Sequence, residues 1–175
     1  MDIVVFESLY GNTAAVAAAI AVGLGEDTRA LTTSEATPDV VAAARVVVAG
    51  APVHAMSLPT AATRESARAK PQGAEHMPAD LGHLSMREWL TALPRGPRLG
   101  AAFDTRVRGP LGHGSSKAIA QTLEACGFTL LDAPRGFTVH MHTSSSEPAA
   151  LLARGQLDLA REWGEQLRER AAALV

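Results

Sequence analysis

The stretch IVVFESLYGNT, residues 3–13, joins an apolar run to a helical segment through a short polar turn. The run from Ile3 to Phe6 is continuous, the pattern of a strand buried on both faces in a parallel sheet. From Thr13 onward the chain is rich in alanine, with larger apolar residues four positions apart as far as Leu24, and Gly25 follows as a stop signal. The stretch therefore predicts a strand, a turn and a helix.

The turn carries groups that suit an anion. Ser8 and Thr13 provide hydroxyls, and Gly11 lets the backbone turn closely just before a helix, whose first N–H groups have no acceptor within the helix. In a doubly wound sheet the ligand crevice lies at this edge. We therefore predict a phosphate site in the loop from Ser8 to Thr13. The alternative is that Gly11, Asn12 and Thr13 only cap the helix.

Outward from this loop, strands and helices alternate along the chain. Further strands are predicted at residues 28–31, 46–49, 99–103 and, split or bulged near Pro134 and Gly136, at 128–131 and 137–139. Helices are predicted at 37–44, 85–93, around Ile119 and Leu123, and from about 148 onward. This alternation predicts one α/β domain over residues 1–175, doubly wound around a parallel sheet. Residues 60–97 form a long irregular connection, which is usually functional or partly mobile.

Composition excludes several classes of function. The chain has 175 residues, of which 47% are hydrophobic and 19% charged, and its net charge of -2 gives no field that would recruit nucleic acid or an anionic membrane. The single cysteine, Cys126, excludes a disulfide framework and suits a reducing compartment, so we expect a cytoplasmic protein without a membrane segment. His140 and His142 alternate without a visible third ligand, and we expect no metal site. His76 and His83 are expected to face water.

The turn resembles the phosphate loop of the flavodoxin family, which reads serine or threonine, any residue, tyrosine or threonine, glycine, a small or polar residue, and threonine. The residues that carry the resemblance are Ser8, Leu9, Tyr10, Gly11, Asn12 and Thr13. The three-glycine spacing of a dinucleotide fingerprint is absent. The resemblance extends through the order of elements over nearly the whole chain. It implies a flavodoxin-like fold with five parallel strands in the order 2-1-3-4-5, and FMN as the cofactor.

In flavodoxins the flavin ring lies between the loops after the third and fourth strands. The corresponding residues here are Pro52, Val53, His54 and Ala55 in the first loop, and Asp104, Thr105 and Arg106 in the second. Phe103 to Arg106 also loosely resembles the menaquinone-dependent protoporphyrinogen oxidases. Low-potential flavodoxins carry acidic and aromatic residues where this chain has Arg106 and Arg108, so a cation beside the ring would raise the hydroquinone potential. The alternative is that these arginines are solvated or pair with acids such as Asp104.

The resemblance implies an oxidoreductase. Our first hypothesis is an FMN-dependent reductase or oxidase that passes electrons from a small-molecule donor to a small acceptor such as a quinone, over a flavin face framed by His54 and Arg106. A non-enzymatic carrier that docks on a redox protein is the second hypothesis. The third is a flavin-free interaction domain that keeps the fold. The sequence identifies neither donor nor acceptor, and it leaves a homodimer open.

Overall fold

The computed structural model describes residues 1–54, 56–69, 78–109 and 114–174. The strands are β1 (Asp2–Phe6), β2 (Thr28–Thr32), β3 (Val46–Pro52), β4 (Arg98–Val107), β5 (Phe128–Leu130) and β6 (Arg135–Val139). The helices are α1 (Asn12–Leu24), α2 (Pro38–Ala43), α3 (Ala61–Arg68), α4 (Met86–Thr91), α5 (Ser115–Ala125) and α6 (Gln156–Ala172). None of the helices in these ranges is both long and apolar enough to cross a bilayer.

The strands form one parallel sheet in the order β2-β1-β3-β4-β5, which confirms the predicted order. The predicted split of the fifth strand is also confirmed. β5 pairs with β4 at residues 98–100, whereas β6 pairs with β4 at residues 103–107. Two short strands therefore share one position in the sheet, and β4 is long enough to reach past both.

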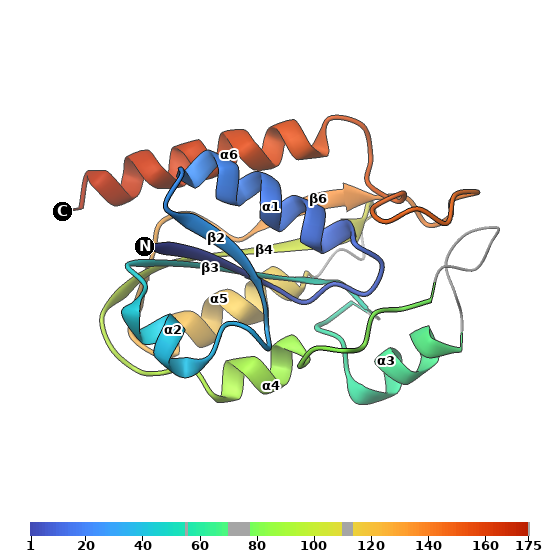
Figure 1. Cartoon of the computed structure of the whole chain (residues 1–175), viewed down its shortest axis with the longest axis horizontal. Helices are drawn as coiled ribbons and strands as arrows, with labels where there is room; N and C mark the ends of the chain where they lie inside the picture. Colours follow the sequence, from blue (N-terminus) through green and yellow to red (C-terminus); the bar gives the residue numbers. More distant parts are fainter. Residues whose placement is uncertain (55, 70–77, 110–113, 175) are drawn as a thin grey trace.

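Helices cover both faces of the sheet (Figure 1). On one face, α1 and α6 bury a core that includes Val16, Ile20, Trp163 and Leu167. On the other face, α2, α4 and α5 bury a core that includes Val41, Met86, Trp89, Ile119 and Leu123. Both tryptophans belong to these cores, and each indole N–H has an acceptor, the Ala36 carbonyl for Trp89 and the Asp132 carboxylate for Trp163.

Two glycines bring α1 and α6 into close contact. A Cβ on Gly164 would overlap the carbonyl oxygen of Ile20 and would lie 3.0 Å from the Cα of Gly23. A Cβ on Gly23 would in turn overlap the carbonyl oxygen of Arg161. Because the clashing atoms belong to the backbone, no side-chain rotation could relieve them, and the helix spacing depends on both glycines.

The structure corrects three details of the sequence prediction. Helix α6 begins at Gln156 rather than near residue 148, because residues 148–152 form turns that pack on the loop before α1. Helix α3 was not predicted, although Thr60 and Thr63 form a capping box at its start. From the sequence, Ser115 or Ser116 is the predicted N-cap of helix α5, but the structure has Gly114 at this position.

Candidate functional site

The loop between β1 and α1 presents a row of backbone N–H groups. Gly11 adopts a left-handed conformation with φ 81°, which bends the chain into the start of the helix. In the described part of the chain, the N–H groups of Leu9, Gly11, Asn12 and Thr13 have no hydrogen-bond acceptor. Successive free N–H groups around a left-handed glycine, at the positive end of a helix dipole, form an anion-binding concavity.

The side chains of this loop do not cap α1. Helix α1 has no side-chain cap and no acidic residue in its first turn. The Asn12 Oδ1 atom instead accepts from the Leu151 N–H at 3.1 Å, and the Tyr10 carbonyl accepts from the Ala149 N–H at 3.0 Å. Gly11 thus occupies the N-cap position without a capping side chain, and the Asn12 and Thr13 side chains bond elsewhere, so the first N–H groups of the helix stay available.

A cavity of about 230 Å³ opens beside these N–H groups. It is lined by Ser8, Leu9, Tyr10, Asn12, Thr13, Pro52, Val53, His54, Thr105, Val107, Val139, His140, Met141 and Leu151. The cavity thus brings together most of the residues predicted from the three loops. Ala55 lies outside the described residues, as does His76. Among the lining residues that the structure describes, none is a lysine or an arginine.

Two hydroxyl groups in the cavity wall contact each other. The Oγ1 atoms of Thr13 and Thr105 lie 2.9 Å apart and are buried. The Oγ atom of Ser8 is also buried, and it has no hydrogen-bond partner in the described part of the chain. A buried hydroxyl without a partner costs free energy, so Ser8 marks a position where a ligand oxygen would be stabilising.

Asp104 and Arg106 lie outside the cavity lining. Because side chains alternate along β4, Thr105 and Val107 point toward the cavity, whereas Asp104 and Arg106 point to the other face of the sheet. The buried Asp104 carboxylate accepts from Arg106 Nε at 2.5 Å, from Arg106 Nη2 at 3.0 Å and from the Ser116 N–H at 2.9 Å. The Arg106 guanidinium fits against Gly114 and Gly136, at both of which a Cβ would overlap it.

This pairing answers the question left by the sequence. Arg106 is paired with Asp104, which was the alternative considered from the sequence, and its bond to the Ser116 hydroxyl joins β4 to the start of α5. Arg108 is exposed at the end of β4 and also does not line the cavity. Neither arginine is among the described residues that line the cavity, and the expected effect of a cation on the hydroquinone potential stays a prediction.

His54 enters the cavity from the loop after β3. Its backbone forms a tight turn with Ser57, with the His54 N–H donating to the Ser57 carbonyl at 2.9 Å. Burial lowers the pKa of His54, and the positive charge of Arg64 lowers it further. Both effects favour the neutral form of the His54 imidazole.

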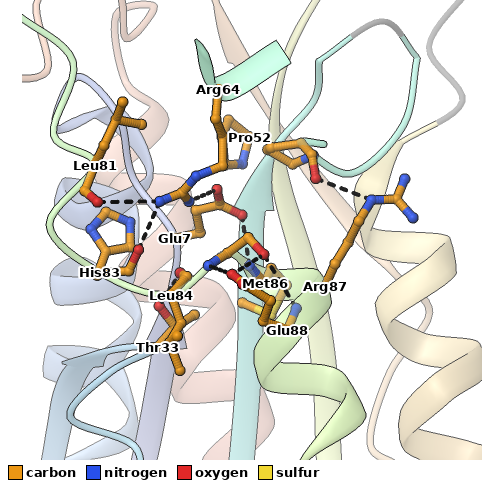
Figure 2. Close-up of polar contacts among 12 residues, drawn as sticks. Glu7, Thr33, Pro52, Arg64, Leu81, His83, Leu84, Met86, Arg87 and Glu88 are labelled. Atoms are coloured by element: carbon orange, nitrogen blue, oxygen red, sulfur yellow. Dashed lines mark hydrogen bonds and ion pairs between the residues drawn. The ribbon is translucent and has the colours of Figure 1, made fainter. Parts of the chain in front are cut away.

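A second group of polar residues lies behind the loop (Figure 2). The fully buried Glu7 carboxylate pairs with Arg64 of α3 and accepts from the Met86 N–H at 2.8 Å. The Arg64 guanidinium also donates to the His83 carbonyl at 2.7 Å. The His83 ring accepts the Ser8 N–H on Nε2 at 3.3 Å. The expectation that His83 faces water is wrong, because only 8% of the residue is exposed.

Sequence reasoning missed several residues of this site. Val139, His140 and Met141 reach the cavity because β6 extends along the far half of β4. Leu151 reaches it because its N–H donates to Asn12 Oδ1 and its carbonyl accepts from the His140 N–H. Arg64 and His83 come from the irregular connection, where no periodic pattern gave a signal. One signal was present: Glu7 follows a fully apolar strand, and an acidic side chain at such a position requires a buried partner.

Comparison with known proteins supports the fold. No protein-family model matches the chain, and no curated protein matches it. Among solved structures, an archaeal flavodoxin matches with a TM-score of 0.62 and 20% identity, over 98% of both chains. Flavodoxin 2 from Bacillus cereus matches with a TM-score of 0.65 and 11% identity, over 97% of this chain and 99% of that one. A flavodoxin, WrbA-like protein from Agrobacterium tumefaciens matches with a TM-score of 0.57 and 17% identity, over 98% and 97%. The fold is flavodoxin-like.

Proposed function

We propose that this protein binds FMN and acts as a flavin-dependent oxidoreductase. The observation that carries the proposal is the cavity beside α1. Its free N–H groups, its unpartnered Ser8 hydroxyl and its Thr13–Thr105 hydroxyl pair together form a seat for a phosphomonoester. The seat lies at the carboxyl ends of β1, β3 and β4, where doubly wound sheets bind their ligands. The flavodoxin-like solved structures support the same assignment.

The residues around the cavity fit the parts of FMN in a consistent order. The loop from Ser8 to Thr13 would bind the phosphate, and Thr105 would extend the polar wall toward the ribityl chain. The cavity is smaller than most small-molecule sites, so we expect the flavin ring to extend out of it, between His54 and Val107. When bound, FMN would supply the redox chemistry, and these residues would hold it in place.

The rim of the cavity favours a small apolar electron acceptor such as a quinone. Val107 and Met141 line the cavity and are 43% and 70% exposed. None of the described lining residues is acidic, whereas a carrier that docks on a basic redox partner would present acidic groups there. A reductase acting on a small acceptor therefore fits the rim better than a carrier.

Cofactor binding gives the first test. Purified protein should show flavin absorbance, and mass measurement of the released cofactor should identify FMN. The apo-protein should bind FMN more tightly than riboflavin. The S8A substitution should reduce the ratio of these two affinities. Protein that carries no flavin and does not bind FMN at saturating concentration would refute the proposal. Steady-state oxidation of a nicotinamide donor with quinone acceptors then distinguishes a reductase from a carrier.

A further inference from the structure

His83 is fixed in position at both its backbone and its ring. Its carbonyl accepts from Arg64, whose guanidinium is itself held by the buried Glu7 carboxylate (Figure 2). Its ring nitrogen Nδ1 lies 3.7 Å from the Asp80 carboxylate. The segment is tied to the loop a second time, because the Asp80 N–H donates to the Leu9 carbonyl at 2.8 Å. The ring is thus held where Nε2 meets the Ser8 N–H.

The Ser8 N–H differs from the other N–H groups of the loop. It points to the back of the loop and is satisfied by His83, whereas the N–H groups of Leu9, Gly11, Asn12 and Thr13 have no acceptor among the described residues. The planar peptide that carries the Ser8 N–H also contains the Glu7 carbonyl and the Ser8 Cα, so the contact with His83 fixes the plane of that peptide. The contact thereby helps to place the Ser8 Cα, from which the hydroxyl extends to the cavity wall.

This contact requires one protonation state of the imidazole. Nε2 accepts the Ser8 N–H only while it carries no proton, so the neutral ring must carry its proton on Nδ1, on the side of Asp80. Protonation of Nε2 would place two N–H groups face to face in a buried position. Burial lowers the pKa of His83, while Asp80 and Glu7 oppose that shift and Arg64 adds to it.

We propose that His83 is a positioning residue for the phosphate loop, and that adding a proton to its ring weakens binding of a phosphomonoester in the cavity. The inference rests on the proposed FMN site and deepens it. The positive charge of a protonated ring would by itself attract a phosphate. Asp80 faces the ring and offsets that charge, and the opposite charges of Glu7 and Arg64 are paired with each other. Nothing in the described chain replaces the lost acceptor of the Ser8 N–H.

The first experiment measures the affinity of the apo-protein for FMN and for riboflavin between about pH 5 and pH 8, by quenching of flavin fluorescence. FMN has its own phosphate titration near pH 6, so the comparison is between variants. H83Q keeps an acceptor that does not titrate, H83L removes the acceptor, and H142Q removes an exposed histidine outside the cavity lining.

We expect wild type and H142Q to lose FMN affinity more steeply than H83Q as the pH falls. H83L should bind FMN about tenfold more weakly than wild type at pH 7.5, with little change for riboflavin. Coinciding pH profiles for wild type and H83Q would overturn the inference while leaving the FMN site intact. An absence of FMN binding by wild type at every pH would overturn both.

A second measurement needs no ligand and no variant. In the ¹⁵N NMR spectrum of the wild-type protein at pH 7.5, His83 should be the Nδ1–H tautomer, and the Ser8 amide should exchange slowly with solvent. On acidification, exchange at Ser8 should accelerate as the His83 ring titrates. An Nε2–H tautomer, or a Ser8 amide indifferent to the titration of His83, would contradict the inference even if H83L fails to fold.

Discussion

The hydroxyl oxygens of Thr13 and Thr105 lie 2.9 Å apart in the wall of the cavity, where the start of α1 contacts β4. One hydroxyl donates to the other, so one hydrogen remains free to turn toward a ligand. The pair joins two residues 92 positions apart in the sequence and gives the cavity a polar wall, where the described lining residues include no lysine, arginine, aspartate or glutamate.

Replacing Thr105 by valine keeps the shape of the side chain and removes this hydroxyl. We expect the affinity for FMN to fall about fivefold, the effect of one neutral hydrogen bond. Isothermal titration of the apo-protein measures it. T122V is the matched control, because the Thr122 hydroxyl donates to the Ala118 carbonyl within α5 and does not line the cavity. Equal affinities of T105V and T122V would exclude a role for this hydroxyl.

The crossing of α1 and α6 leaves no room for a methyl group. G164A should lower the free energy of unfolding by about 3 kcal/mol, because the added Cβ meets backbone atoms of Ile20 and Gly23 and the helices must separate. G109A should leave stability nearly unchanged, since a Cβ at Gly109 would have no atom within 4 Å. Urea unfolding compares the two. Equal midpoints would mean that the helices separate without cost.

The buried ion pair between Glu7 and Arg64 can be tested against an exposed pair on the same helix. R64M should cost about 3–5 kcal/mol of stability, because it leaves the Glu7 carboxylate buried without its cation. R68M should cost less than about 0.5 kcal/mol, since the Arg68–Glu65 pair is largely exposed.

The double variant E7Q/R64M completes the cycle for this pair. It should be more stable than the sum of the two single changes predicts, because it buries no uncompensated charge. Chemical denaturation at pH 7 measures all four proteins. Additive effects would show that the two charges do not interact in the folded protein.

Stability should fall as the pH drops from about 7.5 to 5.5. The pKa values of His54 and His83 are lowered by burial from their ordinary 6.5, so the unfolded chain takes up protons first. The contribution of these neutral rings is complete above about pH 6.5 and is lost as the pH falls toward the lowered pKa values. Urea unfolding across this range should show a flatter profile for H54Q/H83Q. A wild-type profile as flat as that of the variant would contradict the assignment.

FMN binding should depend weakly on salt. The described residues that line the cavity include no lysine and no arginine, so the phosphate would be bound by N–H groups, hydroxyls and the helix dipole. We expect the dissociation constant to change less than about threefold between roughly 20 mM and 0.5 M sodium chloride. Titrations at several salt concentrations test this. A tenfold loss would reveal a cation at the site.

The sequence predicted the part of the site whose residues are close together in the chain. Residues 3–13 contain the strand end, the left-handed glycine and the helix start, so local rules were sufficient there. Alternation on β4 could also have been applied further, since it separates Thr105 from Asp104 and Arg106. It was the charge of Arg106, rather than its direction, that led to the expectation of a contact with a flavin ring.

The back of the site was not predictable in the same way. His83 is 75 residues from Ser8, and Arg64 is 57 residues from Glu7. Neither lies in a segment with an apolar period, so no local pattern connects them. Such pairs are determined by the packing of whole elements. Only Glu7 indicated from the sequence that a buried polar partner was required.

The ion pair between Glu7 and Arg64 also decides how far this protein could be shortened. Long surface insertions can often be replaced by a brief linker at little thermodynamic cost. Deleting residues 61–84 would instead leave the buried Glu7 carboxylate without Arg64 and remove the His83 acceptor of the Ser8 N–H. A shortened version of this protein would therefore have to keep residues 61–84, or else redesign the end of β1 when they are removed.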